Sequence, residues 1–198
     1  IQGTSTDFGT AGAGIPAVAG GWKELGRTTL GSANATTTVS SLADKRYYMI
    51  LHNGTGYSGF GNFEYRLGNS TIDTGTNYAS RESNNGAVDT PRAGQPSNYI
   101  GVGYQDYDED FSVSYVSNLA SKEKLIISHN VAHDGTGASN APERNETIGK
   151  WSNTSNPMDI FNRYNSNGTQ AIGSELVVLG WDPDDTHTDN FWEELASV

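Results

Sequence analysis

Residues 111–117, with the sequence Phe-Ser-Val-Ser-Tyr-Val-Ser, decide the fold class of this chain. The large apolar residues Phe111, Val113 and Tyr115 stand at every second position. This period of two is typical of a half-buried β-strand. Residues 124–131, Lys-Leu-Ile-Ile-Ser-His-Asn-Val, contain a continuous apolar run at 125–127. Such a run is typical of a strand that is covered on both faces or lies centrally in a sandwich.

Similar short runs recur along the chain, separated by turn sequences rich in Asn, Asp and Gly. Asn and Asp tolerate a positive φ angle and Gly adopts one freely, so these clusters predict tight turns. Because helical periodicity is lacking, we expect an all-β fold: an antiparallel β-sandwich that is jelly-roll-like, with another antiparallel sandwich as the alternative. The expected strands are 22–30, 35–42, 45–53, 60–68, 98–104, 111–117, 124–131, 157–164 and 174–181.

The composition divides the chain into three parts. Residues 1–21 carry a single charge and consist mostly of Gly, Ala, Thr and Ser, which predicts a flexible linker or an extended arm that pairs with a neighbouring subunit. Residues 22–190 hold the expected strands and form the β-sandwich domain. The four residues from Trp192 echo the four from Trp22, so we expect residues 191–198 to be a tail or the start of a second repeat.

The charge and the residue usage exclude several classes of protein. The 198 residues carry a formal net charge of -11, whereas nucleic-acid-binding proteins need basic surfaces that displace counterions. The chain has no cysteine, which excludes disulfide scaffolds, zinc ribbons and thiol nucleophiles. No run approaches the roughly 18 consecutive apolar residues of a membrane-spanning helix. We therefore expect no nucleic-acid partner and no membrane insertion.

An acidic loop near the end of the chain is a candidate metal site. Its carboxylates stand at Asp182, Asp184, Asp185 and Asp189. Ca²⁺ takes about six to eight oxygen ligands, which closely spaced aspartates supply. The loop does not match the helix-flanked calcium-binding pattern, so a solvated acidic loop is the alternative. Structural Ca²⁺ at these residues is the one cofactor that the sequence suggests.

Two tyrosines are candidates for stacking on sugar rings, because an aromatic ring offers an apolar face and its hydroxyl offers a hydrogen bond. Tyr57 stands between glycines on an expected loop tip, and Tyr107 lies in the acidic run 104–110. A half-buried place on a strand is the alternative for such tyrosines. The serine-nucleophile pattern G-x-S-x-G fails at Phe60, and no carboxylate pair is singled out for glycoside hydrolysis. We assign no catalytic residue and expect no enzymatic activity.

Several expected turns contain N-x-S/T tripeptides, the acceptor sequence for asparagine glycosylation. In an organism that glycosylates asparagine, these turns are accessible acceptors. The candidate glycosylation sites are Asn34, Asn53, Asn69, Asn145, Asn153 and Asn167.

Three stretches resemble strand signatures of a known group of proteins. The first joins Trp22 and Leu25 to Thr-Leu-Gly-Ser-Ala at 29–33. The others are Asn-Glu-Thr-Ile-Gly-Lys-Trp-Ser-Asn-Thr at 145–154 and Ile-Gly-Ser-Glu-Leu-Val-Val-Leu-Gly at 172–180. Together they span about residues 22 to 181 and resemble a loose family of β-sandwich modules in predicted tail-fibre and virion-surface proteins of marine viruses of bacteria and archaea. The resemblance implies an extracellular, self-assembling module and carries over no catalytic residue.

The sequence thus favours a non-enzymatic structural module of a virion surface appendage or another extracellular assembly. Its expected partners are further copies of itself, as a homo-oligomer or filament, and host surface glycans. A carbohydrate-binding module or lectin is one alternative. The other is a subunit of a cellular extracellular filament that is joined by strand exchange through residues 1–21.

Overall fold

The structure is a computed structural model that describes residues 21–59, 62–91, 96–104, 109–133, 135, 137–183 and 185. Within these ranges the chain forms fifteen β-strands, and no helix is long and apolar enough to cross a membrane. The strands are β1 (Lys23–Thr29), β2 (Thr36–Val39), β3 (Tyr47–Gly54), β4 (Tyr57–Ser58), β5 (Asn62–Asn69), β6 (Thr71–Ile72), β7 (Tyr78–Asn84), β8 (Thr90–Pro91), β9 (Ile100–Tyr104), β10 (Asp110–Ser117), β11 (Lys124–Ala132), β12 (Glu143–Trp151), β13 (Ile160–Asn165), β14 (Thr169–Gln170) and β15 (Glu175–Trp181).

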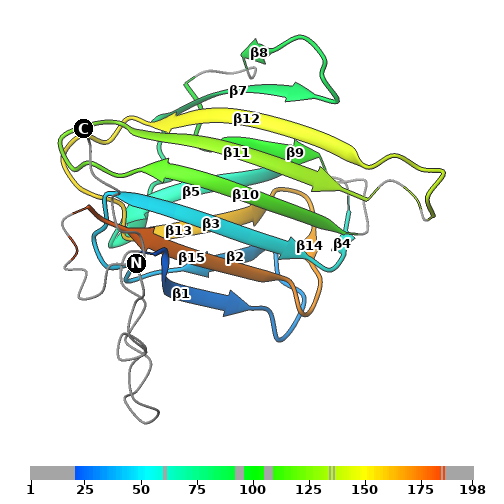
Figure 1. Cartoon of the computed structure of the whole chain (residues 1–198), viewed down its shortest axis with the longest axis horizontal. Coiled ribbons are helices and arrows are strands. Elements are labelled where there is room, and N and C mark those ends of the chain that lie inside the picture. Colours follow the sequence, from blue (N-terminus) through cyan, green and yellow to red (C-terminus); the bar gives the residue numbers. More distant parts are fainter. Residues whose placement is uncertain are drawn as a thin grey trace, which may run out of the picture.

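The strands build two antiparallel sheets that pack against each other (Figure 1). The larger sheet has eight strands in the order β1-β15-β3-β10-β11-β12-β7-β8. The smaller sheet has the order β2-β13-β5-β6, with β9 also paired to β5, and β14 and β4 form a separate two-stranded ribbon. The prediction of an all-β antiparallel sandwich is therefore confirmed, whereas the jelly-roll connectivity stays a prediction.

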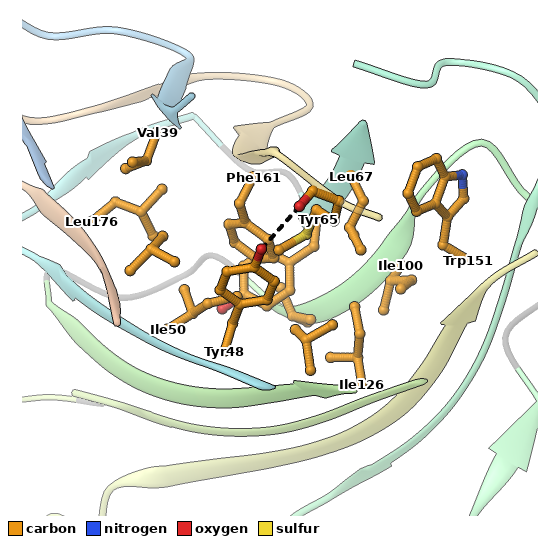
Figure 2. Packing of buried hydrophobic residues seen from close by; sticks show 14 of the residues in the cluster. Val39, Tyr48, Ile50, Tyr65, Leu67, Ile100, Ile126, Trp151, Phe161 and Leu176 are labelled. Atoms are coloured by element: carbon orange, nitrogen blue, oxygen red, sulfur yellow. Dashed lines mark hydrogen bonds between the residues drawn. The ribbon is translucent and has the colours of Figure 1, made fainter. Parts of the chain in front are cut away.

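Large side chains from both sheets fill the space between them (Figure 2). Tyr48 and Ile50 of β3 and Ile126 of β11 meet Tyr65 of β5 and Phe161 of β13 in one buried cluster. The rings of the last two residues lie 4.8 Å apart between centroids. Each fully buried side chain of this size contributes about 1.5–3 kcal/mol to the stability of the fold. This cluster holds the two sheets together.

All nine strands expected from the sequence lie in the structure at the expected places, with bounds that differ by a few residues. Two long strands, β7 and β12, were not predicted. Both carry polar residues at inward positions, such as Ser80 on β7 and Asn145 and Thr147 on β12. Because these positions are buried but not apolar, the strands lack the hydrophobic alternation on which the prediction depends.

The faces of β10 and β11 differ from the sequence prediction. Ser112 and Ser114 are buried, whereas Phe111 and Tyr115 are exposed. The run at 125–127 is not covered on both faces, because Leu125 and Ile127 point to solvent. The larger sheet therefore turns its serines inward and several of its largest apolar side chains outward.

The expected arm and tail fall almost wholly outside the described residues, apart from Gly21. The expected division of the chain at residues 21 and 190 stays a prediction.

Candidate functional site

The outward-facing side of the larger sheet, here called the outer face, carries a concentration of exposed apolar side chains. They are 37–56 % exposed, although residues of these types are usually buried in a monomer. They come from the segment before β1 and from strands β3, β10, β11 and β12. The residues are Trp22, Tyr47, Phe111, Tyr115, Leu125, Ile127, Val131 and Ile148.

The strand register makes these side chains neighbours on one surface. Tyr115 of β10 lies directly opposite Met49 of β3 and Ile127 of β11. Ile127 in turn lies opposite Ile148 of β12. Directly opposed residues of antiparallel strands share one face of the sheet. One apolar row therefore crosses four strands, and Val113 lies in the next row on β10.

Two aromatic pairs extend this surface. Tyr47 and Trp181 stack with ring centroids 5.6 Å apart and an interplanar angle of 22°. The ring of Trp22 lies 6.2 Å from that of Tyr115. Because β1 is separated from β10 by two strands, Trp22 reaches over the outer face from the sheet edge. Aromatic pairs of this kind add about 0.5–1.5 kcal/mol beyond simple burial.

Charged residues lie around the outer face in mutually neutralising pairs. Arg27 binds Glu24 at 2.8 Å and Glu175 at 3.0 Å beside β1. At the opposite side Arg81 binds Asp89 at 3.0 Å. Further pairs there are Lys150–Glu123 and Arg144–Glu146. Exposed pairs of this kind contribute about 0–1 kcal/mol each. Most of these pairs lie toward the sides of the outer face, but Glu146 and His129 stand in the row next to the apolar row.

A groove of about 500 Å³ runs over the β7, β11 and β12 part of the outer face. Leu125, Ile127 and Ile148 form its apolar floor, and Arg81 and Pro91 lie along one side. A second hollow of about 310 Å³ lies beside it on the described outer face and includes His129 and Glu146.

The inward side of β10 and β11 carries hydrogen-bonded serines beside the apolar Val116 and Ile126. Ser114 Oγ donates a hydrogen bond to Ser128 Oγ at 2.8 Å, and Ser112 Oγ lies 3.0 Å from the hydroxyl of Tyr65. Buried hydroxyls cost free energy unless they are hydrogen-bonded in this way. With the serines facing inward, the residues at the alternate positions, among them Tyr115 and Ile127, face outward.

A buried ion pair lies at one end of this polar interior. Arg163 of β13 and Asp110 of β10 are both inaccessible, and Arg163 Nη2 donates to Asp110 Oδ2 at 2.7 Å. Asn130 donates to the same oxygen at 2.7 Å, and the hydroxyl of Tyr57 donates to Oδ1. The guanidinium also lies 3.7 Å from the ring centroid of Phe63. Two sheets and the β4 strand thus meet at one carboxylate.

His52 and Gln170 continue the network. Arginine only donates hydrogen bonds and the Gln170 carbonyl oxygen only accepts them. The imidazole therefore accepts from Arg163 at Nδ1 and donates from Nε2 to Gln170 Oε1, which lies 3.0 Å away. Burial raises the pKa of Asp110, while the hydrogen bonds from Tyr57 and Asn130 oppose that shift. Both oxygens of the Asp110 carboxylate are engaged by protein donors.

Of the two candidate sugar-binding tyrosines, the structure describes only Tyr57, and it places this residue differently from the prediction. Tyr57 is not an exposed loop tip: it lies on β4, packs on Phe63 at 4.5 Å between ring centroids, and donates to Asp110. The ring of Tyr57 is therefore partly buried and packs against the hydrophobic core. Tyr107 lies outside the described residues.

The candidate calcium ligands are only partly described. Asp182 accepts a hydrogen bond from the backbone N–H of Arg46 at 3.0 Å, and Asp185 forms an ion pair with Lys45. Asp184 and Asp189 lie outside the described residues. Within the described part of the chain, no three acidic or histidine side chains are grouped as a metal site requires. Calcium binding by this loop stays a prediction.

The candidate glycosylation sites differ in accessibility. Asn145 is buried on β12, where its side chain donates to Asn84, so it is a poor acceptor in the folded chain. Asn69 and Asn153 are half-buried. Asn34, Asn53 and Asn167 are exposed. Modification of the exposed three stays a prediction.

The outer face was not recognised from the sequence. A usable signal was nevertheless present: Ser112, Ser114 and Ser128 stand at alternate positions of two neighbouring strands, which marks a shared polar interior. If these serines face inward, the alternate positions of β10 and β11 face outward.

Comparisons with known proteins found no relative of this chain. No family model, no curated protein and no solved structure matches the chain.

Proposed function

We propose that the protein is a non-enzymatic structural module that self-associates through the outer face of its larger sheet. A fully exposed large side chain offers on the order of 200 Å². At 37–56 % exposure the eight outer-face residues present about 700 Å² of accessible surface. The largest apolar patch of a typical monomer is about 300–600 Å². An area above that range supports a surface that is covered by a partner.

The non-enzymatic part of the proposal rests on how the buried polar groups are used. A groove of about 360 Å³ lies at the ends of β3, β10 and β11, with Asp110, Glu109 and His133 along it. The carboxylate of Asp110 is held there by Arg163, Tyr57 and Asn130. A carboxylate with both oxygens engaged in this way is poorly suited to act as a general base or a nucleophile.

We propose that the module belongs to an extracellular assembly, and we favour a virion surface appendage over other assemblies of this kind. The placement rests on the resemblance of residues 22–181 to virion-surface sandwich modules.

The test compares two substitutions to glutamate. Ile127→Glu puts a charge in the apolar row, whereas Val88→Glu puts the same charge on an exposed loop outside the outer face. Sedimentation velocity over a range of concentrations should show oligomers for the unmodified chain and for the Val88 variant. The Ile127 variant should remain monomeric with an unchanged circular dichroism spectrum. A chain that is monomeric at every concentration would overturn the proposal.

One observation favours a carbohydrate-binding module as a second candidate. The stacked pair of Tyr47 and Trp181 places two aromatic rings together on the outer face, and an aromatic ring offers the apolar surface on which a sugar can stack. A glycan screen with the unmodified chain and the Trp181→Ala variant tests it. Glycans that bind only the unmodified chain would favour this candidate, and a screen without hits would eliminate it for the glycans tested.

A further inference from the structure

Resting on the proposed function, we propose that the partner of the outer face is the same face of a second copy, so that two chains form a closed two-fold dimer. The larger sheets of the two copies would then pack face to face, and the smaller sheet of each copy would lie on the side away from the interface. A stable protein interface takes about 800 Å² from each partner. The roughly 700 Å² that the eight outer-face residues present accounts for most of that area before their neighbours are counted.

The distribution of exposed apolar residues favours an identical surface as the complement. Elsewhere on the described residues, the large exposed hydrophobic side chains are Val88, Leu119 and Ile172, and they lie on separate loops. A head-to-tail contact would need a second apolar patch for the outer face to cover. In the described part of the chain no such patch exists. A two-fold contact needs none, because each face covers the other.

The charge distribution points in the same direction. The chain carries a net charge of -11, so two copies repel each other over most approaches. No ionised side chain stands in the row of Met49, Tyr115, Ile127 and Ile148, and the arginines, Lys150 and Glu146 around this row are held in ion pairs. Two acidic copies therefore meet least repulsion at this face.

The sheet edges are less suited to association than the face. β1 has a bulge between Glu24 and Gly26, which interrupts the row of backbone groups that an added strand would use. At the other end β8 has only two residues, and one of them is Pro91. Short, bulged and proline-containing edges disfavour pairing with another chain.

The two-fold relation makes a specific geometric prediction. Val113 lies near the middle of β10, opposite Leu51 of β3 and His129 of β11, and β10 is a central strand of the sheet. A residue at the centre of a two-fold interface lies beside its own copy. Since the chain has no cysteine, one introduced thiol reports this contact without interference.

The experiment uses the full chain with single cysteines at Val113, Leu51 and Ile127, and with Ser40→Cys as the control. Ser40 is exposed and follows β2 of the smaller sheet. Mild oxidation or a short bismaleimide should link at least one outer-face variant to itself about tenfold faster than the control, because the dimer raises the local thiol concentration. Sedimentation of the linked species should give a dimer.

Three results would overturn the dimer, and they are distinguishable. If the chain is oligomeric but none of the three outer-face variants links to itself, the two-fold contact is wrong while self-association stands. If the chain is monomeric, both the dimer and the proposed function fail. If a monomer dimerises only after removal of residues 1–20, the occupant of the outer face is the chain's own N-terminal segment.

Discussion

Ser114 and Tyr115 are adjacent on β10, yet the serine is fully buried and the tyrosine is 44 % exposed. The serine hydroxyl reaches Ser128 across the strand pair at 2.8 Å, whereas the tyrosine ring packs beside Trp22 on the outer face. The inward side of β10 is thus held by hydrogen bonds of its serines as well as by hydrophobic burial of Val116.

The Ser114–Ser128 contact is expected to stabilise the fold as a pair. Ser114→Ala leaves the buried hydroxyl of Ser128 without this partner, which should lower the free energy of unfolding by about 1–3 kcal/mol. The double variant Ser114→Ala with Ser128→Ala should lose less than the two single variants together, because no hydroxyl is then left unpaired. Urea unfolding of the four chains measures the coupling. Additive losses would show that the hydrogen bond does not matter.

The Asp110–Arg163 pair should be costly to break from one side only. Asp110→Ala leaves a guanidinium buried without its carboxylate, and we expect a loss of about 3–5 kcal/mol in the free energy of unfolding. Adding Arg163→Met removes the uncompensated charge and should restore part of the loss. Chemical denaturation of both variants tests this. A double variant that is less stable than Asp110→Ala would contradict the account.

Alkaline pH should unfold the protein. Burial raises the pKa of Tyr48, Tyr57, Tyr65 and Tyr78 above the ordinary value near 10. In the unfolded chain these tyrosines ionise near pH 10, so the stability that they contribute is complete below that pH and is lost as the pH rises above it. Thermal midpoints measured from pH 8 to pH 12 should fall steeply above about pH 10. Tyrosinate absorbance should show four tyrosines that ionise only with unfolding.

Gly149 should tolerate no side chain. A Cβ there would lie 2.8 Å from Cγ2 of Ile100, which belongs to the opposite sheet. Gly149→Ala therefore forces β12 and β9 apart, at a cost of about 1–3 kcal/mol. Gly31→Ala is the matched control, because an added Cβ there meets nothing within 4 Å. Equal thermal midpoints for the two variants would show that the contact between the sheets is loose.

The sequence was sufficient to predict the fold class and nine strands, because turn residues and apolar runs mark them locally. It was insufficient for β7 and β12, whose inward residues Ser80, Asn145 and Thr147 are polar. It also misplaced Tyr57, since flanking glycines resemble a loop tip although the hydroxyl binds Asp110. The outer face depends on which side of β10 and β11 packs inward, and only the assembled interior decides that.

The Arg163 network has a consequence for how the chain reaches its native state. Arg163 meets His52 from 111 residues away and Asp110 from 53 residues away, so these contacts form only after long loops have closed. Folding that depends on such distant partners is slow, on the order of milliseconds to seconds for all-β proteins. During that interval the apolar residues of β10 and β11 are open to other chains, which makes refolding yield dependent on protein concentration.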